Sequence, residues 1–217
     1  MTAAKPDEMS PDLASELAYV RALAEEGRDA PLLGGFYYLL WGGLIGAAAL
    51  FAFLVTMDVL SFGRQSIFGV WIAAGLLGWA ASFLNGRRTG AKPGALTIGN
   101  RTAQAVWFSV GVFMTLLWVA IMFAHDNFTA LGVPPYFLFA MMFPVAFGVY
   151  GVAFYASAVA ARLDWLKWFA LLSWGFSIAS LFLAGSDYQF LLGAAGSFAC
   201  AALPGLLLMR EEPKEIV

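Results

Sequence analysis

The stretch NGRRTGAKPGALTIGNR, residues 85–101, carries four cationic side chains and separates two long apolar stretches. The apolar stretch before it covers about residues 67–84, and the one after it covers about residues 103–124. Each is close to the roughly 20 residues that a helix needs to cross the hydrocarbon layer of a bilayer. The quoted stretch therefore predicts a connection between two membrane-spanning helices.

Four further apolar stretches lie outward from this pair, at about residues 32–59, 136–161, 166–184 and 190–209. Of the 217 residues, 61% are hydrophobic and only 12% are charged, whereas about a quarter of a soluble domain is charged. Runs this apolar predict helices, because each helix bonds its own backbone groups within lipid. We predict an all-α, polytopic membrane protein with a six-transmembrane-helix bundle over 31–209. A cytoplasmic amphipathic helix and linker (1–30) precede it, and a short cytoplasmic tail (210–217) follows it.

The cationic residues are sorted to one side of this arrangement. Only Arg64 of the twelve Lys and Arg residues falls in a connection on the other side. The positive-inside rule then predicts that both termini are cytoplasmic, at the inner or plasma membrane if the source is bacterial. Four cations close to an anionic surface predict contact with lipid headgroups by Arg87, Arg88, Lys92 and Arg101. The spacing from Gly86 to Gly90 is one residue too short for a phosphate-binding P-loop, and no nucleic-acid partner is expected.

The segment MSPDLASELAYVRALAEEGRDAP, residues 9–31, is the one polar element of appreciable length. Ser10 suits an N-cap, Pro11 suits the first helical position and Gly27 suits the end of a helix. The apolar side chains of this helix form one narrow stripe, made of Leu13, Leu17, Val20 and Ala24. That stripe can fold back on the protein's own cytoplasmic face, dock another polypeptide or lie on the membrane. Because the helix is acidic, an anionic leaflet disfavours the last of these.

Ionisable side chains near the middle of a membrane span are functional candidates by default, and the six stretches contain none there. The single histidine, His125, cannot form a two-histidine haem site within one copy, and no hydrolase motif accompanies it. We therefore expect no enzymatic activity and no cofactor.

A set of four polar residues on the outer side leads to a more specific hypothesis. Asp58, His125, Asp126 and Asp187 all map near the outer ends of the spans. Carboxylates and an imidazole that converge there could ligate a divalent cation or respond to pH. The alternative is that they are solvated loop residues and helix caps.

Aromatic residues within the spans permit another hypothesis. The deep ones are Trp79, Trp118, Trp174, Tyr150 and Tyr155. A cavity lined by such rings would suit a small apolar ligand, while the alternative is that they face lipid or pack in the core.

Small residues and prolines predict how the spans pack. The pairs Gly42 and Gly46, Ala74 and Gly78, Gly193 and Ser197, and Gly196 and Cys200 each lie one turn apart. Such pairs allow helices to approach closely, within one copy or between two copies, and they predict a central position for the last span. Pro144 and Pro204 predict kinks, because each frees the carbonyl four residues earlier, at Ala140 and Cys200.

Two functions remain open from these observations. The first is a non-enzymatic scaffold or regulatory accessory subunit that engages a protein partner or a second copy through its cytoplasmic face. The second is a small-molecule binding or transport component with an aromatic-lined intramembrane site. Six spans with both ends inside resemble the general plan of vitamin-binding subunits of certain ATP-driven importers. A helix before six spans also resembles some exporter permeases. Both resemblances concern topology and transfer no residue roles.

Overall fold

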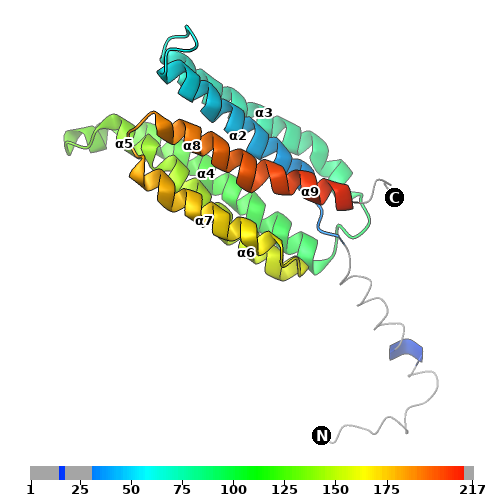
Figure 1. The fold of residues 1–217 in the computed structure, drawn as a ribbon. Helices are drawn as coiled ribbons and strands as arrows, with labels where there is room; N and C mark the ends of the chain where they lie inside the picture. Colours follow the sequence, from blue (N-terminus) through cyan, green and yellow to red (C-terminus); the bar gives the residue numbers. More distant parts are fainter. Residues whose placement is uncertain (1–14, 18–30, 213–217) are drawn as a thin grey trace, which may run out of the picture.

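The computed structural model describes residues 15–17 and 31–212, and the regular structure of these residues is entirely helical (Figure 1). Residues 15–17 form one short helical segment. The other helices are α2 Gly35–Thr56, α3 Gln65–Gly90, α4 Ile98–Ala130, α5 Pro135–Ala140, α6 Met142–Ala161, α7 Leu166–Phe182, α8 Tyr188–Ser197, the π-helical turn η2 Phe198–Ala202 and α9 Leu203–Glu211. Figure 1 shows the long helices side by side along one axis.

Five helical segments in the described residues are long and apolar enough to cross a membrane. They are Gly35–Thr56, Gln65–Gly90, Ile98–Ala124, Tyr136–Ala161 and Tyr188–Glu211. The chain is thus an integral, multi-pass helical protein, as the apolar composition predicts. The predicted span at 166–184 forms α7, which has 17 residues and a length of about 25 Å. The hydrocarbon layer is about 30 Å thick, so α7 alone falls short of it.

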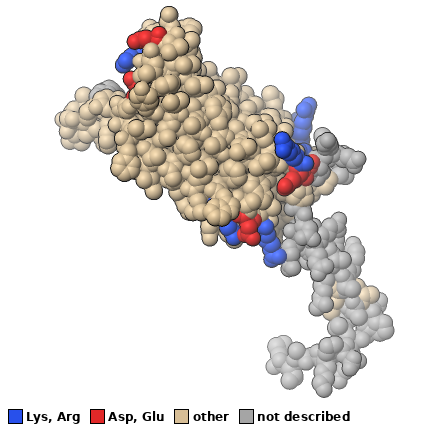
Figure 2. All heavy atoms as spheres, viewed as in Figure 1, with Lys and Arg blue, Asp and Glu red and all other residues tan. Residues whose placement is uncertain are grey.

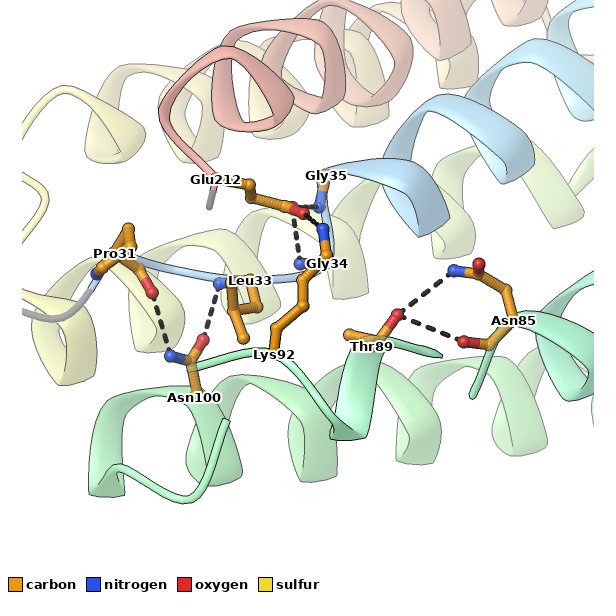
Figure 3. Close-up of polar contacts among 9 residues, drawn as sticks. All are labelled: Pro31, Leu33, Gly34, Gly35, Asn85, Thr89, Lys92, Asn100 and Glu212. Atoms are coloured by element: carbon orange, nitrogen blue, oxygen red, sulfur yellow. Dashed lines mark hydrogen bonds and ion pairs between the residues drawn. The ribbon is translucent and has the colours of Figure 1, made fainter. Parts of the chain in front are cut away.

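The basic stretch 85–101, which the sequence predicts to be a connection between two spans, is only partly a loop. Helix α3 continues to Gly90 with Arg87 and Arg88 in its last turn, and α4 already begins at Ile98. The Thr89 hydroxyl donates to the Asn85 carbonyl at 3.3 Å and accepts from the Asn85 amide at 3.1 Å (Figure 3). These bonds tie the last turn of α3 together, because hydroxyls can bond to the preceding helical turn.

The segment α8–η2–α9 packs at the centre of the bundle against α2, as its small residues predict. Of the 18 consecutive residues with the highest hydropathy in this segment, 56% are buried. The corresponding stretches of α3 and α4 are only 11% and 6% buried. The two backbones approach closely at glycines: a Cβ added to Gly42 would lie 2.4 Å from the Ala202 nitrogen, and one added to Gly205 would lie 2.4 Å from the Leu39 nitrogen. The absence of side chains at these positions makes the contact possible.

Other small residues of the predicted pairs receive aromatic rings instead of a helix backbone. A Cβ added to Gly193 would lie 2.3 Å from the Phe143 ring, and one added to Gly196 would lie 2.5 Å from the Phe147 ring. Phe143 and Phe147 belong to a buried apolar cluster with Ala49 and Ala194. Ring insertion fills the space beside the glycines and joins α6 to the central segment.

Both prolines coincide with irregular helix geometry, as predicted. A break at Met141 separates α5 from α6 three residues before Pro144, and the π-helical turn η2 ends directly before the segment that contains Pro204. The Ala140 carbonyl, which Pro144 cannot bond, accepts from the buried Gln189 amide at 2.7 Å. The same amide donates to the Ser180 carbonyl at 3.0 Å. One side chain from α8 thus satisfies backbone groups of two neighbouring helices.

The start of α2 and the end of α9 meet at the same end of the bundle, where Glu212 bonds to Gly34 and Gly35. The end of α6 and the starts of α4 and α7 also lie there, in contact through Asn100 and a cluster that includes Ala158 and Leu166. Lys92, two residues after the end of α3, pairs with Glu212 at the same place. Figure 2 shows charged side chains at the two ends of the molecule and an uncharged flank between them. We name the end that contains Glu212 the basic end, because every Lys and Arg of residues 31–212 except Arg64 lies there.

Candidate functional site: the clasp at the basic end

The basic end is held together by a group of polar contacts that we name the clasp, defined by Pro31, Leu33, Gly34, Gly35, Lys92, Asn100 and Glu212 (Figure 3). These residues come from the segment before α2 together with the first residue of α2, the connection between α3 and α4, the first turn of α4 and the residue after α9. An apolar cluster that includes Leu32, Tyr38, Ala103 and Leu208 lies beside them. The clasp therefore joins four parts of the chain above a buried apolar layer.

Glu212 supplies the central contacts of the clasp. Its Oε1 accepts hydrogen bonds from the Gly34 N–H at 2.9 Å and from the Gly35 N–H at 2.7 Å, and its Oε2 pairs with the Lys92 ammonium. The Glu212 side chain is only 5% exposed, and that of Lys92 is 23% exposed. A carboxylate at a helix start is favourable, because the first N–H groups have no partner within the helix and carry positive partial charge.

The conformation of Gly34 allows this cap. Gly34 precedes α2 with a φ of 112° and has no side chain to cap the helix. Side chains other than glycine rarely adopt that φ, and the left-handed backbone lets two successive N–H groups face one carboxylate oxygen. Glu212 therefore does for α2 what a local N-cap side chain does for most helices, from a position 178 residues away.

Asn100 fixes the segment that leads into α2. Its Oδ1 accepts from the Leu33 N–H at 2.6 Å, and its Nδ2 donates to the Pro31 carbonyl at 2.9 Å and to the Gly94 carbonyl at 3.0 Å. Asn100 is 6% exposed, so these bonds satisfy a polar group that would otherwise be costly to bury. The site where the N-terminal segment joins the bundle is thus held by side-chain bonds.

The clasp holds segments of the chain in position, since its carboxylate, ammonium and amide groups are all bonded to one another or to backbone groups. It brings the points at which segments 1–30 and 213–217 join the bundle to the same end of the molecule. Neither Glu212 nor Asn100 was predicted from the sequence. The only sequence signal for either was the pattern Thr97-x-x-Asn100, in which the Thr97 hydroxyl caps α4 by accepting from the Asn100 N–H at 3.4 Å.

Only part of the predicted partner-binding stripe can be located. Leu13, Val20 and Ala24 lie outside the described residues, and Leu17 is exposed. The stripe stays a prediction.

The four predicted lipid-contacting cations divide into two groups. Arg87, Arg88 and Arg101 are exposed at the basic end. Lys92 instead pairs with Glu212, because its ammonium reaches the buried carboxylate, and it serves the clasp.

The five predicted ligand-lining aromatics make their contacts in four different places. Trp79 donates to the Thr115 hydroxyl at 3.1 Å between α3 and α4, while Trp118 stacks on Phe68 with ring centroids 5.7 Å apart. Trp174 stacks on Tyr155 at 6.2 Å and donates to the Gly148 carbonyl.

Tyr150 packs against Trp107 and Phe147 in the core. Only Tyr155 and Trp174 are therefore brought into mutual contact. The rings pack where their individual neighbours leave room, which periodicity along one helix does not specify.

The four outer polar residues can be located by their backbone. Asp58 lies in the turn after α2 with a φ of 55°, Asp126 lies in α4, and Asp187 precedes α8. Among the described residues, Asp58, Asp126 and Asp187 do not gather into a group that could hold a metal ion. The side chain of His125 is not described, so a site that depends on it stays a prediction.

Models of known protein families, curated proteins and solved structures yield no significant match to this chain. The fold itself therefore defines the class of protein: an all-helical, multi-pass integral membrane protein.

Proposed function

We propose that this chain is a non-enzymatic accessory or scaffold subunit that crosses the membrane six times. In this proposal both termini face the cytoplasm, and the protein engages a partner protein through its basic end. The observation that carries the proposal is the bonding of Glu212 to Gly34 and Gly35, which holds the start of the first span beside the end of the last one.

That contact supports an even number of crossings. Five crossings would separate the start of α2 from the end of α9 by the full thickness of the membrane. The remaining apolar helix, α7, runs back along α6 (Figure 1) and supplies the sixth crossing. Its shortfall of about 5 Å can be met by local thinning of the bilayer and by flanking residues. Lys167 in its first turn reaches out to the exposed Asp164, at 2.6 Å, as snorkelling side chains do.

The distribution of charge supports a cytoplasmic basic end. Of the described cations, seven lie at the basic end and only Arg64 lies at the other. Short connections rich in Lys and Arg are retained in the cytoplasm during insertion. With six crossings and this sidedness, the proposal has both termini on the cytoplasmic side.

The clasp gives the N-terminal segment a fixed attachment point for binding a partner. Pro31 and Leu33 are held by Asn100, and Gly34 and Gly35 are held by Glu212. A binding segment attached to a fixed point loses less freedom on docking than one attached to a flexible linker. The stripe of Leu13, Leu17, Val20 and Ala24 is the part of that segment that we assign to the partner.

Cysteine labelling tests the crossing number. Cys200 is buried, so the wild-type chain provides a low-background reference for a membrane-impermeant maleimide. In intact cells we expect the variant Ser186→Cys, between α7 and α8, to be labelled, and Ala91→Cys, between α3 and α4, to be labelled only after the cells are opened. If Ser186→Cys also requires opened cells, α7 does not cross and the proposal fails.

Paired substitutions test the partner. Leu17→Asp places a charge on the predicted stripe, whereas Ser15→Asp places the same charge about 160° away around a helix with 3.6 residues per turn. We expect cross-linking in cells followed by affinity purification to recover one stoichiometric protein with wild type and Ser15→Asp, and to lose it with Leu17→Asp. Equal recovery from both variants would contradict docking through the stripe. A small molecule retained in native mass spectrometry, with no protein partner, would favour the transport alternative.

A further inference from the structure

After the exposed Ile98 at its first position, the outward face of α4 changes from polar to apolar between Arg101 and Phe108. Arg101, Thr102 and Gln104 are exposed there, and Phe108 is exposed further along the same helix. Asn100, adjacent to Arg101, is part of the clasp, so Arg101 lies at the level of the basic end. Phe108 lies seven residues further on, or about 10 Å towards the middle of the flank. This order matches the change from headgroup to acyl chain across one leaflet of a bilayer.

Two shallow hollows lie side by side on this face. The first has a volume of about 390 Å³ and is lined by Ile98, Arg101, Thr102, Ala105 and Val106. The second has a volume of about 370 Å³ and is lined by Arg101, Gln104, Ala105 and Phe108. Arg101 and Ala105 line both, so the two hollows flank a single row on the helix. Because the side chain of Ala105 is small, it leaves the helix surface between the two hollows unobstructed.

The charge of Arg101 is not neutralised within the described part of the chain. The ion pairs there join Lys92 to Glu212 and Lys167 to Asp164. A guanidinium offers planar, paired donors that match the oxygens of a phosphate group. The Thr102 hydroxyl and the Gln104 amide border the same hollows and add neutral hydrogen-bonding groups at this level.

We propose that the start of α4 binds one anionic diacyl phospholipid, with its phosphate on Arg101 and its two acyl chains in the two hollows beside Ala105. One cation shared by two adjacent, mainly apolar hollows fits a ligand with one headgroup and two chains better than it fits a single partner helix. The site requires only that the basic end lies at a membrane surface. It is independent of the partner proposed above, and loss of partner binding would leave it unaffected.

Native mass spectrometry of delipidated protein tests this site. Phosphatidylglycerol and phosphatidylcholine with identical chains are titrated separately, and the bound fraction is measured for each. We expect wild type to retain phosphatidylglycerol more strongly. Arg101→Gln should lower its apparent affinity about fivefold, since one cation near a membrane surface contributes about 1 kcal/mol. It should lower phosphatidylcholine affinity less, because the choline ammonium offsets the charge of that phosphate.

A matched control separates a site from general attraction. Arg88→Gln removes the same charge at the same end of the molecule, in the last turn of α3 and outside both hollows. We expect it to bind phosphatidylglycerol like wild type. Equal losses for Arg88→Gln and Arg101→Gln would reduce the effect to diffuse electrostatics and overturn the proposal.

A second variant tests the two acyl chains. Ala105→Trp places a bulky ring where the two hollows meet. Because Ala105 is exposed, we expect the bundle to remain folded, as circular dichroism can verify. We expect this variant to lose binding of both lipids. Unchanged binding would show that the chains lie elsewhere, and equal retention of both lipids by wild type would show that no headgroup is recognised.

Discussion

Replacing Glu212 with alanine is expected to be the most damaging single change at the basic end. The substitution removes the carboxylate that accepts from two N–H groups of α2 and pairs with Lys92. Hydrogen bonds to a charged group contribute about 1.5–3 kcal/mol each, and breaking a buried ion pair costs about 3–5 kcal/mol. Because Lys92 is 23% exposed, its ammonium can recover some hydration, which places the expected loss near the lower bound, at about 3 kcal/mol.

Reversible unfolding by sodium dodecyl sulfate in mixed micelles measures this loss. The eight tryptophans report the transition by fluorescence, and a loss of about 3 kcal/mol changes the unfolding equilibrium by about two orders of magnitude. Glu211→Ala is the control, because Glu211 carries the same charge one residue earlier and is exposed. We expect that variant to stay within about 0.5 kcal/mol of wild type.

A double-mutant cycle with Lys92→Met isolates the ion pair from the two N–H bonds. We expect a coupling energy of about 1–2 kcal/mol between positions 92 and 212, within the range measured for contacting residues. The reasoning would be refuted if Glu212→Ala and Glu211→Ala unfolded alike. It would also fail if the effects of Lys92→Met and Glu212→Ala were additive.

Three further changes probe contacts elsewhere in the bundle, each by the same unfolding titration. Gly42→Ala would push a methyl group against the Ala202 backbone and should destabilise by about 1–3 kcal/mol, whereas Gly43→Ala has open space and should stabilise by up to about 1 kcal/mol; a matching sign for both would contradict the packing of α2. Gln189→Leu leaves two buried carbonyls without their donor and should lower the free energy of unfolding by about 1–3 kcal/mol. A free energy of unfolding equal to that of wild type would show that Gln189 does not bridge the two helices. Asn100→Leu breaks three bonds to backbone and should cost about 2–3 kcal/mol, with faster proteolysis after Arg28 as an independent readout; an unchanged cleavage rate would argue against a fixed attachment.

The membrane class and most spans could be predicted because hydropathy accumulates along one segment and needs no partner. The stretches 32–59 and 103–124 became long apolar helices for this reason. The stretch 166–184 was harder, since its helix α7 has only 17 residues and its position along α6 depends on contacts with that helix. The helix irregularities at the two prolines could also be predicted, because a missing N–H is a local property of residues 144 and 204.

The clasp and the aromatic positions could not be predicted in the same way. Glu212 reads as a residue of a polar tail, and Lys92 reads as one more cation in a basic stretch. Their pairing spans 120 residues, so no periodicity within either segment indicates it. The deep aromatics share a composition but have different neighbours, and Trp118 on Phe68 and Trp174 on Tyr155 belong to different helix pairs.

The sequence by itself determined that the chain is helical, apolar enough for a bilayer and asymmetric in its cations, because these properties are sums over neighbouring residues. Only the tertiary structure decided that α2 and the α8–η2–α9 segment meet backbone to backbone, and that a carboxylate at position 212 caps a helix that begins at position 35. Those contacts depend on the relative placement of helices that are distant in the chain. Placement is set by the shape of side chains packing from both partners at once, and neither partner's sequence contains that information alone.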